Sequence, residues 1–266
     1  MKFSVVTPSF NQGKFISGCL HSVLEQADDV LLEHIILDNC STDETTDILA
    51  SYAPAVGSNF SSTVIVEKDS GQTNAINRGF NMASGDIICW LNTDERYRPH
   101  ALAKVQAFFE EHPEIDVAFG DVEFVDADQM LIQIKKEHFY SPAMLLYYGC
   151  FIPSCSTFIR KTAAQRAGAL DESMRVVMDF EWYLRLARSG AKFAPIREVL
   201  ASFTWHDTNI SSTFVDKRKA ERFAVQERYS RLHLSSWLKR PSYWLLKYWW
   251  VGVRVLRRQL AGAHAN

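Results

Sequence analysis

A short apolar run, 87–91, is followed at once by oxygen-bearing side chains. Asn92, Asp94 and Glu95 place one amide and two carboxylates within four consecutive positions. Hard divalent cations such as Mg²⁺ and Mn²⁺ prefer oxygen ligands of this kind, and a cation held here could bind phosphate groups. An acidic turn that merely ends a strand is the competing interpretation, and this segment alone favours neither.

Three further polar segments follow apolar runs in the same way. They are TPSFN (7–11), DNCSTDET (38–45) and EKDSGQTNAINRGF (67–80). If the apolar runs form parallel strands, their carboxyl ends meet at one edge of the sheet, where ligands bind in open α/β folds. One acidic turn is ordinary, whereas four polar turns on one edge indicate a binding site.

Two residues in these segments have roles that their chemistry suggests directly. Asp38 can accept a hydrogen bond from a base or a ribose, and its alternative role as a helix cap is already filled by Ser41 or Thr42. Gly71 permits close approach of the backbone to a ligand, or else it only allows a turn before the next helix.

Strand and helix patterns alternate through the first hundred residues. The predicted strands are 3–7, 34–37, 63–66 and 87–91, and the predicted helices are 15–25, 41–52, 72–82 and 102–109. A capping-box pattern, Ser41 with Glu44 three residues later, marks the start of the second helix. This order predicts an α/β fold with a Rossmann-like, mainly parallel central sheet flanked by helices.

The second half continues the same domain with a different pattern. Short alternating runs from 117 to 134 are typical of a hairpin or a mixed sheet. Helices at 162–167 and 180–189 and strands near Phe193 and at 199–205 follow. We therefore expect one domain over 1–213, made of halves 1–98 and 99–213, and a C-terminal helical extension over 214–266.

Composition and charge exclude several classes of protein. The net charge of −2 over 266 residues indicates no nucleic-acid partner, although basic residues gather beyond Lys217. The five cysteines follow no metal-ligand spacing, which favours a reduced, cytoplasmic setting. The chain starts with a strand pattern rather than a secretory signal, which agrees with that setting.

The extension has the pattern of a helix that lies on a membrane. Pro241 is expected to break the helix, which resumes over 243–260 and is shorter than a spanning helix. Lys247, Arg254 and Arg258 share one stripe, so we expect these cations to contact anionic lipid at the inner face of the cell membrane, with Trp237, Trp244, Trp249 and Trp250 at headgroup depth. A helix packed on the domain or on a partner subunit is the alternative.

The polar segments, taken with SGDIICWLNTDE (84–95) and VMDFEWYLRLARSG (177–190), resemble one known family. In this order they are similar to the pattern of the inverting glycosyltransferases of family two, which have the GT-A fold. The resemblance covers about 2–212. It implies transfer from a nucleotide sugar, most commonly a UDP-sugar, to a saccharide or polyprenyl-linked acceptor, as in synthesis of bacterial surface polysaccharide.

The resemblance also implies donor-binding and metal-binding residues. Asn92 to Asp94 would occupy the family's DxD position, with Asp94 as direct ligand of Mn²⁺ or Mg²⁺ and with Asn92 in place of the first carboxylate. Glu95 is the candidate to supply the missing charge. The remaining donor and nucleotide contacts would come from Thr7, Pro8, Asn11, Asp38, Asp69, Gly71 and Gln72.

The same resemblance places Asp179 as the catalytic base. Inverting transfer is a direct displacement at the anomeric carbon, so a carboxylate must take the proton of the acceptor hydroxyl. A helix N-cap is the structural alternative for Asp179, and Glu181 is the second candidate for the base. His206 resembles the family's late histidine, which completes the metal or diphosphate site.

Aromatic residues and a cysteine-containing segment are expected near the acceptor. The segment 150–156 would form part of the acceptor wall. Trp182 and Trp205 could stack on a sugar, whereas packing in the core is the simpler interpretation of both.

Two other functions compete with sugar transfer. A nucleotidyltransferase would also need a nucleotide pocket and metal-binding carboxylates, but its glycine-rich loop after the first strand is poorly matched by PSFNQGK (8–14). A catalytically silent module that binds a sugar nucleotide or a partner enzyme is the second alternative. Asn92 favours that module, whereas Asp94 and Asp179 oppose it.

Overall fold

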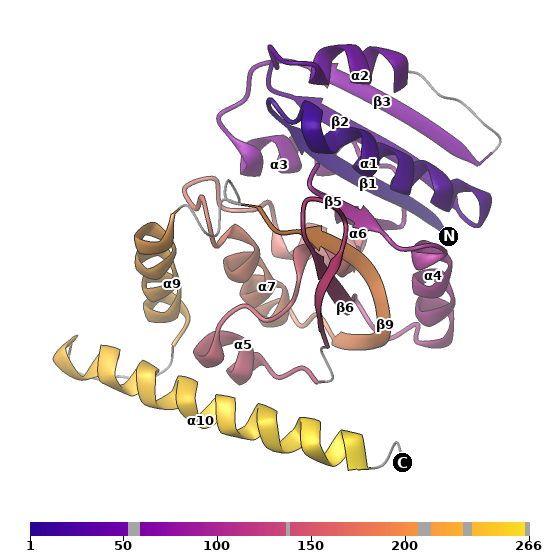
Figure 1. Cartoon of the computed structure of the whole chain (residues 1–266). Coiled ribbons are helices and arrows are strands. Elements are labelled where there is room, and N and C mark those ends of the chain that lie inside the picture. Colours follow the sequence, from indigo (N-terminus) through magenta and orange to yellow (C-terminus); the bar gives the residue numbers. More distant parts are fainter. Residues whose placement is uncertain (53–58, 137–138, 207–213, 231–235, 264–266) are drawn as a thin grey trace.

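The first half of the chain forms a parallel sheet with helices on both faces (Figure 1). The structure, a computed structural model, describes residues 1–52, 59–136, 139–206, 214–230 and 236–263. The elements follow in the order β1 (Lys2–Ser9), α1 (Gly13–Leu24), η1 (Glu25–Asp28), β2 (Leu31–Asp38), α2 (Thr45–Tyr52), β3 (Phe60–Val66), α3 (Gln72–Met82) and β4 (Ile87–Trp90). The strands lie in the order β3-β2-β1-β4 and pair in parallel.

The second half extends this sheet with both parallel and antiparallel strands. Its elements are β5 (Glu95–Tyr97), α4 (Ala101–Glu111), β6 (Val117–Val125), β7 (Leu131–Lys135), α5 (Pro142–Tyr148), η2 (Ser154–Ser156), β8 (Thr157–Arg160), α6 (Lys161–Ala167), α7 (Met178–Arg188) and β9 (Phe193–Thr204). The sheet continues β4-β8-β6-β9-β5, with β7 paired to β6 as the expected hairpin. β6 and β9 are parallel, whereas β8 is antiparallel to both β4 and β6. The predicted α/β fold is therefore confirmed, with a mixed sheet in its second half.

An aromatic core joins the sheet to α3 and α7. Trp90 on β4 lies 6.0 Å, between ring centroids, from Trp182 on α7, and Phe80 on α3 lies 5.6 Å from Trp182. Trp182 is fully buried and donates through Nε1 to the carbonyl of Gly168 at 2.8 Å. Core packing is thus the correct interpretation of Trp182. This core fixes the first turn of α7 against the carboxyl end of β4.

Two further helices complete the described part of the chain, α9 (Val215–Tyr229) and α10 (Ser236–Ala263). The expected break at Pro241 is wrong, because α10 runs through it. Pro241 lies in the second turn of α10, where a proline removes one backbone hydrogen bond near the helix start without ending the helix. Within the described residues, no helix is long and apolar enough to cross a membrane.

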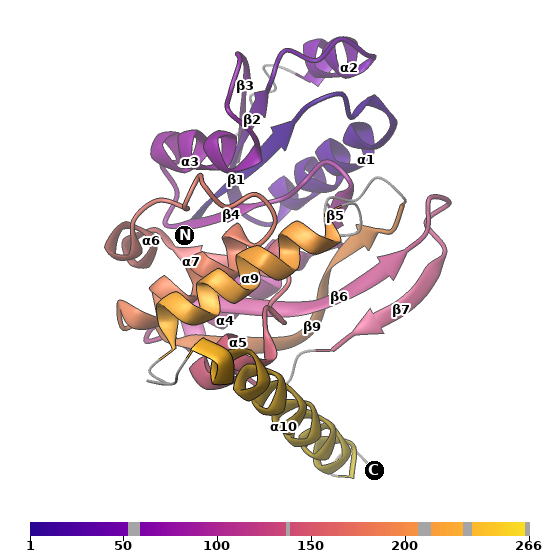
Figure 2. The same cartoon turned by 90° about the vertical axis from the view of Figure 1, so that its left-hand side faces the viewer.

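Helix α10 packs against α5, meets α9 only near its own start through Tyr243 and Phe223, and then projects past the domain (Figures 1 and 2). The ring of Tyr243 is buried 6.1 Å from Tyr147, and the Arg254 guanidinium lies 5.0 Å from the ring centroid of Tyr148. Lys247 and Arg254 lie, partly buried, on the side of α10 that faces the domain rather than on its exposed side, and their expected contact with anionic lipid stays a prediction. Trp250 also turns inward, whereas Trp244 and Trp249 are exposed. The side chains of Trp237 and Arg258 lie outside the described residues.

Candidate active site

The loop after β1 forms one wall of a cavity of about 300 Å³. Pro8 and the neighbouring residues Ser9, Phe10 and Gln12 line it. Thr7 does not, because it is buried and its hydroxyl is 2.8 Å from Nε2 of His34. A nucleotide contact through the Thr7 side chain therefore stays a prediction.

The loops after β1 and β2 are tied together by Asn11 and Asp38. Asn11 donates its N–H to the Ser41 hydroxyl at 2.8 Å and accepts from the N–H of Thr42 at 2.9 Å. Asp38 accepts from the N–H and hydroxyl of Ser41 at 2.8 and 2.5 Å. Both Asp38 oxygens are thus engaged in the loop, and its role in binding a base or ribose stays a prediction.

The expected cap at Ser41 is wrong. Helix α2 begins at Thr45, and the Thr45 N–H donates to the Asp43 carboxylate at 3.1 Å. Because Ser41 donates to Asp38, its hydroxyl holds the loop rather than the helix.

The loop between β3 and α3 lines a second cavity of about 560 Å³. Asp69 accepts from the N–H of Gly71 at 2.8 Å, and both residues line this cavity. Gly71 has φ of +129°, so the turn needs glycine for its conformation although a side chain would meet no atom within 4 Å. Gln72 lines both cavities and donates to Oδ1 of Asn92 at 2.6 Å. The two cavities are therefore adjacent.

The turn between β4 and β5 carries two carboxylates, Asp94 and Glu95, and their side chains point to different partners. Glu95 is buried and accepts from the N–H of Asn92 at 2.7 Å. Burial raises the pKa of Glu95, and the neighbouring charge of Asp94 raises it further. Glu95 therefore points back to the backbone and favours its neutral form, so it is poorly placed to replace the charge missing at Asn92.

Asp94 and His206 form the part of the site that can hold a metal ion. Asp94 Oδ2 lies 3.1 Å from Nε2 of His206, and the Thr204 N–H donates to the Asp94 carbonyl at 3.1 Å. The His206 ring stacks on Phe15 with 4.5 Å between centroids. No group of three or more His, Cys, Asp or Glu side chains in the described part of the chain could hold a metal. One carboxylate and one imidazole nevertheless fit an ion that takes its remaining ligands from phosphate and water, as Mg²⁺ does in phosphate-binding sites.

Asp179 lies in the first turn of α7 and lines the same cavity as Asp94 and His206. Burial raises the pKa of Asp179. The N–H of Phe180 at 2.7 Å and the Cys150 thiol at 3.5 Å donate to its carboxylate and act in the opposite direction. Each Asp179 oxygen therefore accepts one hydrogen bond, Oδ1 from Phe180 and Oδ2 from Cys150, and each keeps a further lone pair for a substrate hydroxyl.

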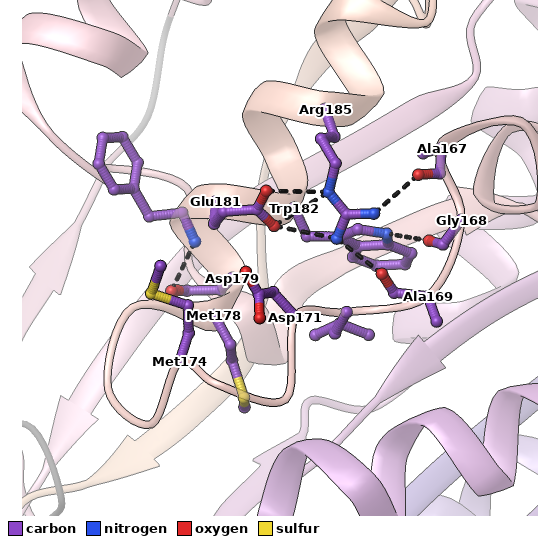
Figure 3. Close-up of polar contacts among 12 residues, drawn as sticks. Ala167, Gly168, Ala169, Asp171, Met174, Met178, Asp179, Glu181, Trp182 and Arg185 are labelled. Carbon is purple, nitrogen blue, oxygen red and sulfur yellow. Dashed lines mark hydrogen bonds and ion pairs between the residues drawn. The ribbon is translucent and has the colours of Figure 1, made fainter. Parts of the chain in front are cut away.

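Glu181, the second candidate for the base, lies on the other side of α7 (Figure 3). It is buried, pairs with Arg185 at 2.9 Å and accepts from the Tyr229 hydroxyl at 2.5 Å. Arg185 also donates to the carbonyls of Ala167 and Ala169. Glu181 is thus part of a structural network.

The segment before Asp179 contains a residue that sequence reasoning missed. Arg175 lines both cavities, and its guanidinium lies 4.7 Å from the ring centroid of Phe214. The Glu221 carboxylate on α9 accepts from the backbone N–H groups of Arg175, Val176 and Val177 at 3.0, 2.8 and 3.2 Å. The only signal in the sequence is a lone cation four positions before Asp179, and nothing local points to Glu221.

Comparison with known proteins gives consistent matches. The chain matches the model of glycosyl transferase family 2 over residues 4–172. It is 29% identical over 234 residues to TuaG of Bacillus subtilis, a putative teichuronic acid biosynthesis glycosyltransferase, and the match covers 86% of this chain and 89% of TuaG.

Solved structures share the fold. S. aureus TarS 1–349 in complex with UDP-GlcNAc superposes with a TM-score of 0.68 at 18% identity, over 90% of this chain and 69% of that one. The present chain spans 41% of a longer TarS chain. The mannosyltransferase PcManGT from Pyrobaculum calidifontis, in complex with GDP-Man and Mn²⁺, gives 0.63 at 16% identity over 98% of this chain and 80% of that one.

Proposed function

Because the chain belongs to glycosyl transferase family 2, we propose that this glycosyltransferase moves a sugar from a nucleoside-diphosphate sugar to a saccharide hydroxyl with inversion. The observation that carries the proposal is that Asp179, Asp94 and His206 line one cavity. A base and a pair of residues suited to a metal-bound diphosphate are the two parts that a direct displacement needs.

Asp179 is the proposed catalytic base. Its carboxylate takes the proton of the attacking hydroxyl as the bond to the anomeric carbon forms, and the diphosphate leaves. Burial raises the pKa of Asp179 toward the working pH, where a general base is most effective. The bonds from Phe180 and Cys150 hold the carboxylate in place meanwhile.

Asp94 and His206 would hold a divalent cation, Mn²⁺ or Mg²⁺. When bound, the ion would stabilise the negative charge of the diphosphate. The Asp94–His206 distance of 3.1 Å supports this assignment, as does the Mn²⁺ named with PcManGT. Asn92, held by Gln72, would contribute an uncharged oxygen to the donor rather than a second metal charge.

The donor site would extend from the first cavity into the second. Asp69, Gly71 and Gln72 line the second cavity, and Pro8 and Asn92 line the first. Thr7, Asn11 and Asp38 would support the nucleotide through the loops they order. A UDP-sugar is the proposed donor, by similarity to the UDP-GlcNAc complex of TarS.

The acceptor would be a lipid-linked saccharide at the inner face of the cell membrane, used in synthesis of a surface polysaccharide. The similarity to TuaG supports this class of product. The exposed side of α10, with Trp244, Leu245, Tyr248 and Trp249, supports a peripheral position on the membrane. On this proposal, the catalytic domain 1–213 works with 214–266 as its membrane-associating extension.

A donor panel tests the proposal. Purified protein is incubated with UDP- and GDP-sugars and with Mn²⁺ or Mg²⁺, and release of nucleoside diphosphate is measured with and without lipid-linked acceptor. We expect acceptor-dependent release with one donor and with one of the ions. Pyrophosphate released from a nucleoside triphosphate would instead identify a nucleotidyltransferase.

The Asp179→Asn variant tests the base. We expect turnover to fall by about a hundredfold or more, within the range that general base catalysis supplies, while donor binding measured by calorimetry stays nearly unchanged. Glu198→Gln, an exposed carboxylate paired with Lys104, is the control and should keep its turnover. Unchanged turnover in Asp179→Asn would remove Asp179 from the mechanism.

A further inference from the structure

Helix α5 lies near α9 and α10 (Figures 1 and 2), and three basic side chains of those two helices lie around its end. Arg222 comes from α9, and Lys247 and Arg254 come from α10. Arg222 donates to the carbonyl of Tyr148 at 2.5 Å, and Arg254 lies over the ring of the same residue. This group, Arg222, Lys247 and Arg254, is called the cationic cluster below.

Arg222 uses only part of its hydrogen-bonding capacity on the protein. Its Nη2 donates to the carbonyls of Tyr147 and Tyr148 at the end of α5. Its Nε and Nη1 make no hydrogen bond, and it forms no ion pair, within the described residues. Capping of α5 therefore accounts for one nitrogen of the guanidinium and leaves the other two nitrogens, which carry three N–H donors.

Lys247 adds a second cation beside Arg222. It is partly buried and forms no ion pair with a described residue. Burial lowers the pKa of Lys247, and the charge of Arg222 lowers it further. Burial likewise lowers the pKa of Arg222, and Arg218 adds to this effect. The charges of Arg222 and Lys247 therefore repel each other, and neither side chain pairs with a carboxylate of the described residues.

Like charges in a partly buried site are costly unless an anion joins them. An arginine with a free edge and a neighbouring lysine are the groups that bind phosphates, the first through paired N–H donors and the second as a point charge. The backbone makes room for the arginine, because Gly149 has φ of +114° and an added Cβ would lie 2.9 Å from the Arg222 guanidinium carbon.

The cationic cluster is close to the proposed base. Gly149 contacts Arg222, and the next residue, Cys150, donates its thiol to Asp179 at 3.5 Å. From standard bond lengths, this path from the Arg222 guanidinium to the Asp179 carboxylate is at most about 15 Å long. That distance suits an acceptor whose phosphate lies one or two sugars from the reacting hydroxyl.

We propose that the cationic cluster binds the phosphate or diphosphate of a lipid-linked acceptor and so places its saccharide in front of Asp179. The inference rests on the proposed function and specifies how its acceptor is recognised. The apolar outer side of α10 would lie in the lipid, which puts Arg222 and Lys247 at the depth of the headgroups, where such a diphosphate is found.

The test compares three vesicles of equal size. One is phosphatidylcholine alone, one contains a few per cent of a polyprenyl diphosphate, and one contains phosphatidylglycerol at the same total negative charge. Binding of the full chain is measured by flotation in the presence of saturating UDP, so that the donor site does not compete. We expect the diphosphate vesicles to bind about tenfold more tightly than the phosphatidylglycerol vesicles.

Two variants assign that preference to the cationic cluster. Lys247→Gln removes one charge of the cluster without removing any hydrogen bond of the described structure. Arg222→Gln removes a second charge. In each variant, the ratio of binding to diphosphate vesicles over binding to phosphatidylglycerol vesicles should fall by about fivefold or more. Binding to phosphatidylcholine should stay the same. Lys219→Gln, on the exposed side of α9 beside Asp216, is the matched control and should keep the preference. Thermal unfolding shows whether each variant is folded.

Equal binding to the two anionic vesicles, or a preference that survives in Lys247→Gln, would overturn the inference. Donor turnover of the same preparations separates this result from the proposed function. Turnover without a diphosphate preference leaves the enzyme as proposed and removes the cationic cluster from acceptor binding. A preference for diphosphate vesicles without turnover would keep the cationic cluster as a phosphate site and would contradict the proposed transferase activity.

Discussion

At the scale of single residues, the candidate site contains three carboxylates whose surroundings differ. Asp94 faces His206, Glu95 turns back to the backbone, and Asp179 lies partly buried beside the Cys150 thiol. Three carboxylates of the same chemistry therefore have three different environments. The DxD resemblance singled out Asp94, whose role as a metal ligand stays a prediction, but side-chain direction at Glu95 depends on the geometry of the turn after β4, which no local pattern specifies.

The pH dependence of turnover is expected to report Asp179. A base acts only when ionised, and burial raises the Asp179 pKa, so activity should fall with decreasing pH at a higher pH than for an ordinary aspartate. The Cys150 thiol lowers that pKa, so Cys150→Ala should move the acid limb of kcat to higher pH. The measurement is a pH profile at saturating donor, with Cys40→Ala as the control. An acid limb that stays in place in Cys150→Ala would contradict this assignment.

At the scale of elements, the spacing of apolar residues predicted most helices and strands and some of the residues at which they begin and end. The helix Gln72–Met82 has the predicted bounds. The segments after β1 and β4 line the first cavity, and the segment after β2 reaches only the adjacent second cavity, through Asn39. Predictions from local sequence patterns were wrong where a residue distant in the sequence determines the local structure. Ser41 bonds to Asp38 instead of capping α2, and Pro241 is accommodated in a helix that packs on α5.

Helix α9 is expected to hold the active-site segment in place through Glu221. Its carboxylate accepts three backbone N–H groups directly before α7, and hydrogen bonds to a charged group contribute about 1.5–3 kcal/mol each. Glu221→Ala should therefore lower the free energy of unfolding by about 2 kcal/mol or more. It should also lower kcat by about fivefold with a smaller effect on donor KM, because Asp179 follows that segment.

Chemical denaturation and steady-state kinetics measure these two effects. Glu227→Ala, also on α9, is the control. It removes a partly exposed ion pair with Lys239 of α10, and such surface pairs contribute about 1 kcal/mol or less. If both variants lost the same stability and kept full turnover, α9 would have no part in positioning Asp179.

At the scale of the whole molecule, α10 shows what a periodic pattern leaves open. Helical spacing says that Lys247 and Arg254 share a side, but it does not say whether that side faces solvent or the protein. The rings of Tyr148 and Phe151 attract the Arg254 guanidinium, which turns the basic side inward and leaves an uncharged aromatic side exposed. The candidate site and the exposed aromatic side of α10 are thus connected through α5 and α9.

Membrane binding should therefore depend on apolar contacts rather than on charge. Trp244 and Trp249 are each 59% exposed on the outer side of α10. From the area that an aromatic side chain buries, transfer of each into lipid contributes about 2 kcal/mol, so the double change to serine should weaken binding to phosphatidylcholine vesicles by at least about tenfold. Met82→Ser, an exposed apolar residue on α3, should leave binding unchanged. Flotation at low and high salt measures the effect, and binding of the unchanged chain that vanished at high salt would show that charge, not the aromatic side of α10, holds the protein on the membrane.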